Sequence, residues 1–475
     1  MTTPSPKPRE EMGQEAKTVA EVVERARRAH RTFCNASQER ADEAVTAIAW
    51  ALYKPENARA MAELAVEDTG LGNVEDKVIK NQRKTFGTLR DLMRVKSVGI
   101  IEEDKAKGIV KYAKSMGVVA AVTPSTNPSA TPVNKAMMAL KGRNAVIISP
   151  SPSGLTATTR TVELMRDALA KVNLPQDLVQ VLPGASKAMT EALMKAVDLV
   201  VVTGSQNNVR AAYSSGTPAI GVGAGNVPVI IDETADLDEA ASKIQQSKCF
   251  DNSTSCSSEN SVVIVDAVYD DAIEAMRRAG GWMAGPEDRQ KIQDALFQGG
   301  KLSRDLIARD ARVFAETVGL PDDAKNARFF MVEETGVGKQ HPFSGEKLSL
   351  VLAVYRAKDF PAARERVREI LNFQGRGHSC GIHTKDLDRA RNLAEELDVV
   401  RVLVNFPHTF GNGGGFNSGL NFTLSMGCGT WGKNSITENL SYKHFLNITH
   451  LVTPIPEDKP SEEELFGKLW EKYGK

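Results

Sequence analysis

Cys256 is the residue whose neighbours point most directly to chemistry. It lies in FDNSTSCSSENSVVIV, residues 250 to 265, between a polar run and an apolar run typical of a strand. A packing cysteine usually has aliphatic neighbours, whereas a nucleophilic cysteine must lose its proton, which polar, partly exposed surroundings and nearby helix N-termini favour. The stretch therefore indicates a catalytic thiol at Cys256, and the earlier Cys249 is interpreted as a packing residue.

Three loops that follow apolar runs are candidates for binding a nucleotide. Ligands of doubly wound sheets bind at the carboxyl ends of the strands, where these loops fall. The same residue types also form simple turns, so both interpretations stay open. The loops contain Ser149 and Pro150 at the end of NAVIIS, Pro183 and Gly184 after LVQVL, and Thr203, Gly204 and Ser205 after LVVV.

Two other motifs fail on their spacing. GVGAGN at residues 221 to 226 has Asn226 where a dinucleotide fingerprint needs its last glycine, and no long helix follows it. His378, Cys380 and His383 in GHSCGIH lack the second ligand pair of a structural zinc site. We therefore expect neither a standard Rossmann phosphate loop nor a metal site.

The elements that must position these residues alternate between strands and helices. Apolar positions recur at helical spacing between residues 15 and 100, and VKYAKSMGVVAAV is then typical of an extended chain. Short apolar runs separated by helices predict right-handed βαβ crossovers and a parallel sheet covered on both faces. The strands are expected at 144–149, 178–184 and 198–204, and the helices at 154–172, 186–196 and 206–214.

A second α/β cycle follows this first one. Two short strands are expected between residues 218 and 232, and a helix over 233–249 leads into the cysteine loop. After a strand at 261–266 we expect helix YDDAIEAMRRAG, helices near 287–309, strands RFFMVEE and LSLVLAVYR, and helix PAARERVREILN. The fold class is therefore α/β, with two open α/β domains.

The composition narrows the class of partner. The 475 residues carry 60 Lys and Arg against 60 Asp and Glu, so no net basic field attracts nucleic acid or an anionic membrane. No apolar stretch approaches the ~18 residues of a membrane span, and the charged N-terminus is unlike a secretory signal. Five scattered cysteines, an odd number, favour free thiols in a reducing compartment. We expect a cytoplasmic protein that acts on a small molecule.

The order of the motifs resembles the CoA-acylating branch of the aldehyde dehydrogenase superfamily. The matching segments follow one another over residues 110 to 450. They are TPSTNPSATPVNKAMMALKGRNAVIISPSP, AAYSSGTPAIGVGAGNVPVIIDETADL, FDNSTSCSSENSVVIVD, GEKLSLVLAVYRAKDF, GRGHSCGIHT and GCGTWGKNSITENLSYKHFLN.

The resemblance implies how the chain is divided. An aldehyde dehydrogenase-like fold would have a coenzyme-binding domain over residues 1–232 and a catalytic domain over 233–432. A C-terminal segment over 433–475 and a hairpin near 100–116 would join subunits, so a homodimer or homotetramer is implied.

The resemblance also implies roles for three residues. In that family the cysteine at the position of Cys256 is the nucleophile, and the asparagine at the position of Asn127 donates a side-chain N–H to the oxyanion. Cys256 would attack an aldehyde, Asn127 and the Cys256 N–H would hold the negative oxygen, and hydride transfer would leave a thioester. His378 matches a histidine near the family's active site, where it would move the proton of the CoA thiol; a structural histidine is the alternative.

A nicotinamide coenzyme is implied in the same way. Glu346 matches the glutamate that contacts the nicotinamide ribose, and Leu348 a nearby apolar residue. The loop after the first strand, Ser149 to Pro152, lacks the glutamate with which NAD-preferring relatives hold the adenosine ribose, so NADP is favoured over NAD. The expected coenzyme-binding residues are Thr123, Pro124, Ser149, Pro150, Gly184, Thr203, Gly204, Ser205, Gly223, Glu346 and Leu348.

The sequence departs from hydrolytic aldehyde dehydrogenases at the residue that would activate water. Those enzymes carry a glutamate base in an E-L-G-G motif, and the matching stretch here is Gly221-Val222-Gly223-Ala224. Water is a poor nucleophile without a base, whereas a thiol attacks a thioester readily. We therefore expect transfer to coenzyme A, with hydrolysis to a free acid as the rival reaction and a nucleotide-binding scaffold as the non-enzymatic alternative.

The polar residues around Cys256 favour a polar or anionic aldehyde that accepts hydrogen bonds from hydroxyl and amide groups. Members of the resembled branch with a similar cysteine loop include enzymes that act on sulfoacetaldehyde, so the resemblance implies sulfoacetaldehyde as the favoured substrate. Acetaldehyde and succinate semialdehyde stay open.

Overall fold

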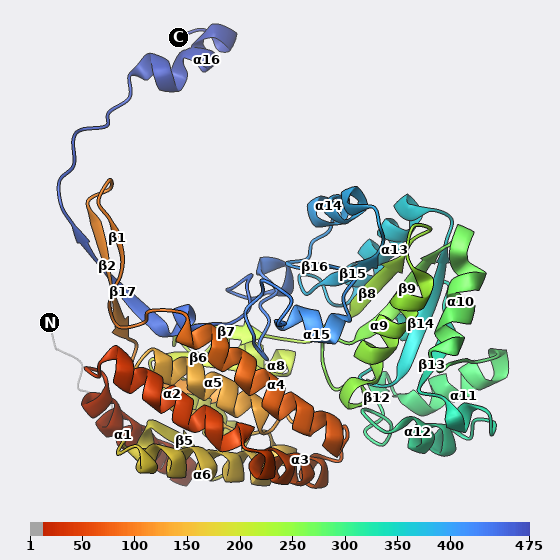
Figure 1. Ribbon diagram of the computed structural model, residues 1–475, viewed down its shortest axis with the longest axis horizontal. Helices are drawn as coiled ribbons and strands as arrows, with labels where there is room; N and C mark the ends of the chain where they lie inside the picture. The colour runs from red at the N-terminus through yellow and green to blue at the C-terminus, as the bar shows by residue number, and fades with distance from the viewer. Residues whose placement is uncertain (1–12) are drawn as a thin grey trace, which may run out of the picture.

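The computed structural model describes residues 13–475, which form two α/β units and a three-stranded arm (Figure 1). Residues 1–12, part of the N-terminus that is unlike a secretory signal, lie outside the described part. The first unit runs from red to yellow in Figure 1 and the second from green to blue, and each has its own sheet and its own apolar core.

Four amphipathic helices precede the first sheet and pack on its elements. α1 contacts β4, α2 contacts α5 and α6, and α4 contacts α5. Ser37 and Asn73 accept hydrogen bonds from backbone N–H groups at the starts of α2 and α4, as N-cap residues do. The four helices are α1 Gln14–Phe33, α2 Gln38–Tyr53, α3 Pro55–Thr69 and α4 Val74–Met93.

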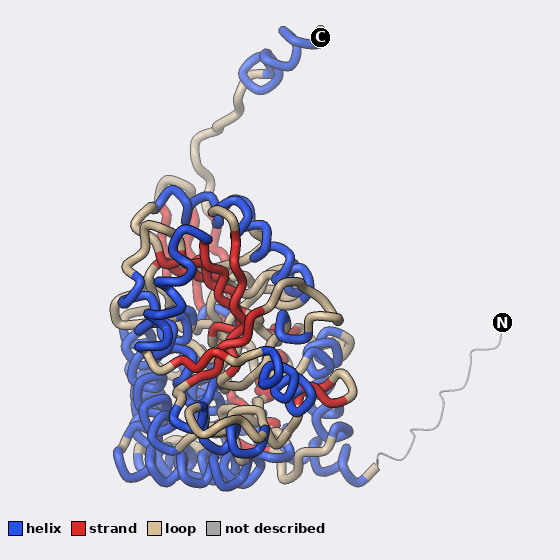
Figure 2. The backbone as a smooth tube through the Cα atoms, turned by 90° about the vertical axis from the view of Figure 1, so that its right-hand side faces the viewer, coloured by secondary structure: helices blue, strands red, loops and turns tan. Residues whose placement is uncertain are grey.

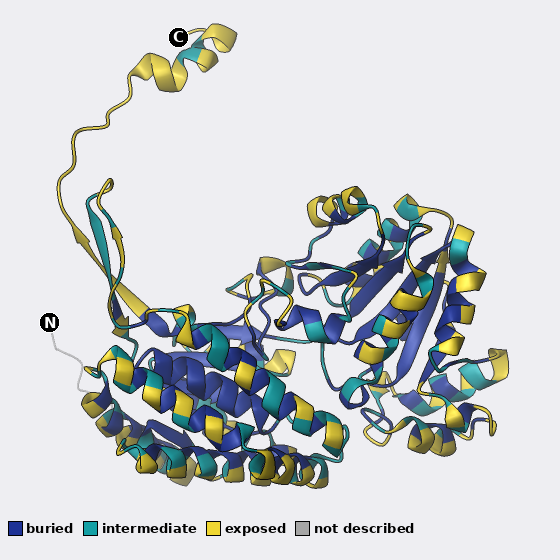
Figure 3. Cartoon of the chain, in the orientation of Figure 1, coloured by how far each residue is buried: buried dark blue, intermediate teal, exposed yellow. Residues whose placement is uncertain are grey.

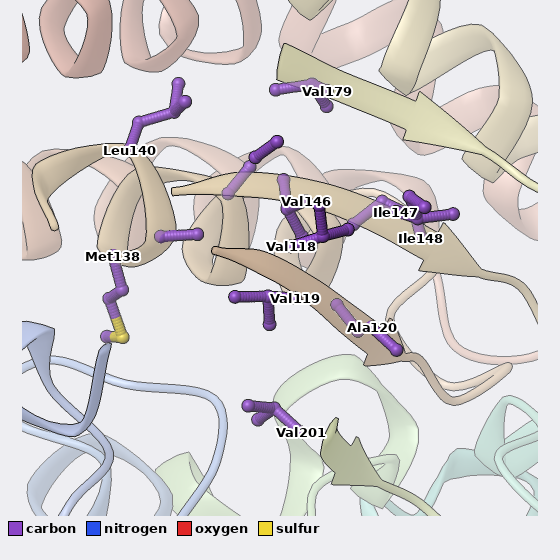
Figure 4. Close-up of a cluster of buried hydrophobic side chains, with 14 of the residues drawn as sticks. Val118, Val119, Ala120, Met138, Leu140, Val146, Ile147, Ile148, Val179 and Val201 are labelled. Carbon is purple, nitrogen blue, oxygen red and sulfur yellow. The ribbon is translucent and has the colours of Figure 1, made fainter. Parts of the chain in front are cut away.

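The first sheet has the strand order β5-β4-β3-β6-β7, and every neighbouring pair is parallel. Its strands consist of buried valine, isoleucine and alanine, such as Val119, Val146 and Val201 in Figure 4, because helices cover both faces. The predicted doubly wound sheet is confirmed. Successive strands depart from β3 first toward β4 and then toward β6, so the ligand crevice of such a sheet lies beyond the carboxyl ends of β3 and β6.

The elements of this unit match the predicted ones, except that the strand expected over 178–184 is shorter and spans only Val179–Val181. The strands are β3 Val118–Val122, β4 Ala145–Ser149, β5 Val179–Val181, β6 Leu199–Thr203 and β7 Ala219–Val222. The helices between them are α5 Ala130–Lys141, α6 Leu155–Lys171, α7 Lys187–Ala196 and α8 Gln206–Tyr213.

The second sheet has seven parallel strands in the order β10-β13-β14-β9-β8-β15-β16. Its β8, Val227–Ile231, pairs with β9 and β15. The domain boundary expected at residue 232 would assign β8 to the first unit. The backbone hydrogen bonds of β8 place it in the sheet of the second unit instead.

The second unit otherwise follows the predicted alternation. Its other strands are β9 Glu259–Val265, β10 Gly281–Met283, β13 Phe329–Glu333, β14 Val351–Ala357, β15 Cys380–His383 and β16 Val402–Val404. Its helices are α9 Leu237–Cys249, α10 Tyr269–Arg278, α11 Pro286–Leu296, α12 Ala311–Val318, α13 Phe360–Phe373, α14 Leu387–Glu396 and α15 His408–Asn412.

The prediction of helices throughout residues 287–309 is wrong in its second half. After α11, β11 Phe297–Gln298 and β12 Lys301–Leu302 form a small antiparallel hairpin. Gly299 and Gly300 turn the chain at φ values of 57° and 74°, which suit a two-residue hairpin turn and glycine in particular.

A three-stranded arm projects from the first unit in Figure 1, and Figure 2 shows the C-terminal chain and its last helix extending away from the rest of the molecule. The predicted hairpin is present as β1 Gly99–Asp104 and β2 Ile109–Ser115, and β17 Leu446–Val452 pairs with β2. α16 Glu462–Tyr473 follows, and the arm is mostly exposed in Figure 3. No helix within residues 13–475 combines the length and apolar character that a membrane span requires.

Candidate active site

A cavity of about 300 Å³ lies between the two units, where the carboxyl ends of β3 and β6 face the cysteine loop. It brings together nine of the fourteen residues predicted from the sequence: Pro124, Asn127, Thr203, Gly204, Ser205, Gly223, Cys256, Glu346 and Leu348. The other five, Thr123, Ser149, Pro150, Gly184 and His378, do not line it.

The loop that carries Cys256 joins α9 to β9 and is held in an unusual backbone conformation. Asp251, Asn252 and Ser253 have φ values of 49°, 51° and 66°, a region that side chains other than glycine seldom occupy. Asp251 Oδ1 accepts a hydrogen bond from the Asn73 N–H at 3.1 Å, and the Asn252 amide donates to Asp310 at 2.7 Å. These contacts fix the loop, and with it the position of the thiol.

The environment of Cys256 differs from the wet loop that the sequence suggested. Residues 251–254 are buried and their side chains bond to protein groups, while Cys256 itself is partly exposed to the cavity. Burial, followed by the negative charge of Glu346, raises the pKa of the Cys256 thiol to about 12. The loop therefore does not by itself favour the thiolate.

A close approach of two loops explains a glycine in GVGAGN. A Cβ on Gly225 would lie 2.2 Å from the Cys256 carbonyl oxygen and 3.1 Å from Nε2 of His378. No other side chain fits there without moving the cysteine loop. The motif thus allows the loop between β7 and β8 to pack against the cysteine loop. A strand, β8, follows it, whereas a helix follows a Rossmann phosphate loop, so the motif is not such a loop.

His378 lies behind this glycine rather than in the cavity. It is buried, and its Nδ1 is 2.7 Å from the Ser379 hydroxyl. Nε2 has no hydrogen-bond partner among the described residues. Burial holds the pKa of the imidazole well below its usual value, so the ring is neutral.

Asn127 is oriented by Lys80, a residue that the sequence analysis missed. The Lys80 ammonium donates to Asn127 Oδ1 at 2.8 Å and to Thr254 Oγ1 at 3.0 Å. Because the amide oxygen is engaged, the amide NH₂ is the end left for a ligand. The backbone N–H of Cys256 has no partner among the described residues, so two donors are available for an oxyanion.

Glu346 and Leu348 lie in the short segment that enters β14. The Glu346 backbone N–H donates to the Gln374 side chain at 3.1 Å, and Leu348 has a φ of 43°. Burial raises the pKa of the Glu346 carboxyl to about 8, so it is mostly protonated at neutral pH. Glu346 is the carboxyl side chain that lines the described cavity.

Helix α4 supplies three cations to the cavity wall, Lys80, Arg83 and Lys84. The sequence carries a signal for them, since Lys77, Lys80 and Lys84 recur at helical spacing and share a face. Such spacing usually marks a solvated face, whereas here all three lysines are buried. Phe410 of α15 lines the same cavity, next to Arg83.

The residues at the ends of β3 and β6 fit a nicotinamide nucleotide. A Cβ on Gly204 would meet nothing within 4 Å, so the backbone there is open to a ligand. Ser205 caps α8, and the N-terminus of a helix offers free N–H groups to a phosphate. Thr123 and Ser149 lie deeper: the Ser149 hydroxyl is buried and bonds to that of Thr190 at 2.9 Å.

Comparison with known proteins gives consistent relatives. The model of the aldehyde dehydrogenase family matches residues 10–291. A sulfoacetaldehyde dehydrogenase (acylating) from Cupriavidus necator is 50% identical over 97% of this chain and 94% of its own length. An acetylating aldehyde dehydrogenase from Geobacillus thermoglucosidasius superposes with a TM-score of 0.90 at 34% identity, covering 94% of this chain and 99% of that one.

Similar structures also hold ligands. A propionaldehyde dehydrogenase from Rhodopseudomonas palustris, with bound CoA and an acylated cysteine, has a TM-score of 0.82 at 26% identity, over 92% of this chain and 97% of its own. An engineered glycolyl-CoA reductase with bound NADP+ has the same TM-score and identity, over 92% and 96% of the two chains.

Proposed function

Because this chain belongs to the aldehyde dehydrogenase family, we propose that it is a CoA-acylating aldehyde dehydrogenase that converts sulfoacetaldehyde into sulfoacetyl-CoA. The reaction would use a nicotinamide coenzyme and would be reversible, since a thioester and an aldehyde interconvert by hydride transfer. The 50% identity to an acylating sulfoacetaldehyde dehydrogenase over nearly the whole chain supports both the chemistry and the substrate.

One observation carries the acylating chemistry. Cys256 shares its cavity with Gly223 and Ala224, the stretch where hydrolytic relatives carry a glutamate base. The carboxyl group that does line the cavity, Glu346, is held largely protonated by burial, and a protonated carboxyl cannot take a proton from water. A thiol needs less activation than water to attack a thioester, so CoA is the better acceptor.

Each step of the reaction uses particular residues of the chain. The Cys256 thiol loses its proton to solvent, and its sulfur bonds to the aldehyde carbon while the electron pair of the C=O bond moves to the oxygen, where Asn127 Nδ2 and the Cys256 N–H stabilise it. Bound NAD(P)+ supplies the acceptor for the hydride that leaves this carbon. The carbonyl re-forms as a thioester on Cys256, and the thiolate of CoA then displaces the Cys256 thiolate. Removal of one oxyanion donor typically costs about 10²–10³ in rate.

NADP is our proposed coenzyme. The loop after β4 has no carboxylate to repel a 2′-phosphate, and Ser153 is exposed there. The Ser149 hydroxyl is unavailable because it bonds to Thr190 inside the unit, so the preference depends on the outer part of the loop.

We also propose that the arm joins two copies of this chain. Apolar side chains of β17 and α16 are exposed along it, among them Leu451, Val452, Leu465, Phe466 and Leu469. Such residues on a projecting arm are typical of a subunit interface, which supports the dimer or tetramer expected from the sequence. A cytoplasmic location is proposed on the five free cysteines alone.

An assay of the purified protein tests the function. Sulfoacetaldehyde, acetaldehyde and succinate semialdehyde would be supplied with NAD+ or NADP+, with and without CoA. We expect NAD(P)H to form only when CoA is present, and kcat/KM for sulfoacetaldehyde to exceed that for acetaldehyde at least about tenfold, as one charge-assisted contact allows. Free acid made at full rate without CoA, or equal values for the two aldehydes, would contradict the proposal.

Substitution of the nucleophile gives the control for this assay. Cys256→Ala should abolish turnover and leave coenzyme binding, measured by fluorescence titration, nearly unchanged. Cys249→Ala is the matched variant, because Cys249 lies at the end of α9 and its Sγ contacts the Arg328 carbonyl outside the cavity. Its activity should stay near that of the wild type.

A further inference from the structure

We propose that Arg83, backed by Lys84, binds the sulfonate group of the substrate and so selects an anionic aldehyde. The proposal rests on the function proposed above and assigns its specificity to two residues of helix α4. Both side chains line the cavity that contains Cys256.

Arg83 is a cation fixed in place without a carboxylate. One of its N–H groups donates to the Phe410 carbonyl at 3.1 Å, and its guanidinium carbon lies 5.1 Å from the ring centroids of both Phe410 and Phe422. No Asp or Glu of the described residues forms an ion pair with it. The guanidinium is therefore preorganised by carbonyl and ring contacts, and most of its N–H donors remain for a ligand.

Lys84 is in a similar position, one residue further along the helix. Its ammonium donates to the carbonyl oxygens of Gly413 at 2.8 Å and Thr423 at 3.2 Å, and it lies 5.7 Å from the Phe422 ring centroid. It has no carboxylate partner within residues 13–475 either, although it is buried. A buried cation without a counter-charge is unfavourable, and an anion in the cavity would remove that penalty.

The other cations of α4 have carboxylate partners. Lys77 and Lys80 both form ion pairs with Asp251, and Arg90 pairs with Asp91 at 2.7 Å. Of the three cations of α4 that line the cavity, Lys80 is paired with Asp251, and Arg83 and Lys84 have no carboxylate partner among the described residues. Glu346 does not neutralise them at neutral pH, because its carboxyl is mostly protonated.

The size of the substrate fits this arrangement. In sulfoacetaldehyde the sulfur atom is two bonds from the carbonyl carbon, so a group that binds the sulfonate must share a cavity with the nucleophile. Two of the three terminal oxygens of the tetrahedral sulfonate can accept from the planar fork of an arginine, with an ammonium as a further donor.

Several hydroxyl groups near Cys256, which the sequence suggested as the anion donors, are already engaged. Thr254 Oγ1 donates to Asp251 at 2.8 Å, and the Ser253 and Ser258 hydroxyls bond to each other. The Ser255 and Ser257 hydroxyls accept hydrogen bonds from the Ser257 N–H and the Asn412 amide, so each keeps a neutral O–H donor. The positive charge that selects an anion therefore comes from α4, and the cysteine loop contributes neutral donors.

Arg83→Gln tests the assignment through a ratio of two substrates. The measured quantity is kcat/KM for sulfoacetaldehyde divided by kcat/KM for acetaldehyde, with CoA and coenzyme saturating. We expect the ratio to fall about 10- to 100-fold, the range for loss of a hydrogen bond between charged groups. Succinate semialdehyde, whose carboxylate lies further from its carbonyl carbon, should lose less.

Arg90→Gln is the matched control. Arg90 lies on the same helix and stacks on Phe416 and Phe422, but it is paired with Asp91 and does not line the cavity. Its ratio should equal that of the wild type. Ethanesulfonate serves as a probe that does not itself react. It should inhibit the wild type competitively against sulfoacetaldehyde, and this inhibition should be lost in Arg83→Gln.

The outcomes separate this proposal from the proposed function. If the wild type does not turn over sulfoacetaldehyde, the proposed function is contradicted. A wild type that prefers it, together with an unchanged ratio in Arg83→Gln, overturns the assignment of Arg83 alone. An unchanged ratio with a higher KM for CoA or coenzyme would mean that Arg83 holds a phosphate. If Arg83→Gln does not fold, Arg83→Lys keeps the charge without the fork and should lower the ratio about three- to tenfold; no change would overturn the assignment.

Discussion

Lys77, Lys80, Arg83 and Lys84 follow one another along α4 and form a row with two halves. In its first half, Lys77 and Lys80 bond to the carboxylate of Asp251, whereas in its second half Arg83 and Lys84 contact backbone carbonyls and aromatic rings. The three lysines are buried and Arg83 is partly buried. The main difference lies in the counter-charge, which the protein supplies to the first half of the row and not to the second.

This difference separates a structural use of charge from a binding use. Lys77 and Lys80 hold Asp251, and through it they hold the backbone of the cysteine loop in its left-handed conformation. Arg83 and Lys84 are held by groups that carry no net charge, so their own charge remains available to a ligand. Removal of the Asp251 carboxylate from the first half should have the largest effect on stability and activity. Loss of the Lys84 proton in the second half should have the smallest effect on activity.

Asp251→Asn should give the largest loss of stability. The carboxylate is fully buried between two ammonium groups, and its removal leaves both of them buried and unpaired. We expect the free energy of unfolding to fall by about 3–5 kcal/mol, measured by urea denaturation, with loss of most activity. Glu75→Gln is the control: it removes the exposed carboxylate of α4 that pairs with Arg59 of α3, and it should cost far less stability than Asp251→Asn. A similar loss of stability in both variants would mean that the buried ion pairs of Asp251 contribute no more to stability than an exposed one.

Lys80→Met should lower kcat more than it lowers substrate affinity. Without the ammonium, nothing in the described structure fixes the Asn127 oxygen, so the amide can turn its donor away from the oxyanion. We expect kcat to fall about 10- to 100-fold, less than or equal to the loss of a complete oxyanion donor. Stopped-flow measurement of NADPH formation reports this step.

Two further variants show whether Lys80 acts through Asn127. Lys77→Met breaks the other bond to Asp251 but not the Asn127 contact, since the Lys77 ammonium donates to the Thr126 carbonyl at 3.2 Å. It should share the loss of stability and keep a higher kcat. In a cycle with Asn127→Ala, the effects on kcat should not add. Additive effects would limit Lys80 to a structural role.

The sequence predicted the sheets and placed Cys256 in a candidate site because both depend on local patterns. Continuous apolar runs such as Ala145–Ser149 mark buried parallel strands, and the hydroxyl-rich stretch around Cys256 can be recognised without knowledge of the fold. Asn127 and Glu346 came from the motifs of the resemblance, and the cavity contains both. The hairpin at Gly299 and Gly300 was missed, although two glycines between the polar residues Gln298 and Lys301 are a turn signal.

The role of α4 could not be read in this way, because it depends on segments far apart in the chain. Arg83 and Lys84 face the cavity only after the residues near Phe410 and Thr423 have folded over the helix. The same lysine spacing on an exposed helix would be an ordinary solvated face. Whether such a cation is paired depends on a carboxylate more than one hundred residues away, as with Asp251.

The protonation of Lys84 gives the finest test of the difference between the two halves. Burial, followed by the charges of Arg83 and Lys80, lowers the pKa of its ammonium from 10.5 to about 7, and the charge of Cys256 opposes this shift. Since kcat/KM reports the free enzyme, the preference for sulfoacetaldehyde over acetaldehyde should be greatest below pH 7 and should fall as the pH rises above it. Arg83 keeps its charge throughout, so the fall should be only about threefold to tenfold. Ionisation of the CoA thiol affects both aldehydes and cancels in the ratio, whereas ionisation of Glu346 near pH 8 adds a negative charge to the same cavity and lowers the ratio further.

Lys84→Met should remove the part of this fall that is centred near pH 7 and leave the part that ionisation of Glu346 causes near pH 8. The variant should also change the pH dependence of stability. An unfolded Lys84 holds its proton up to its ordinary pKa of 10.5, whereas the folded one loses it near pH 7. The unfolded state therefore binds more protons between these values, and the stability of the wild type gains a term that rises with pH. The methionine variant lacks this term.

Two outcomes would show that Lys84 does not face the anion: a wild-type substrate ratio that does not change with pH, or a Lys84→Met variant whose ratio changes with pH as steeply as that of the wild type. The anion would then be bound by Arg83 alone.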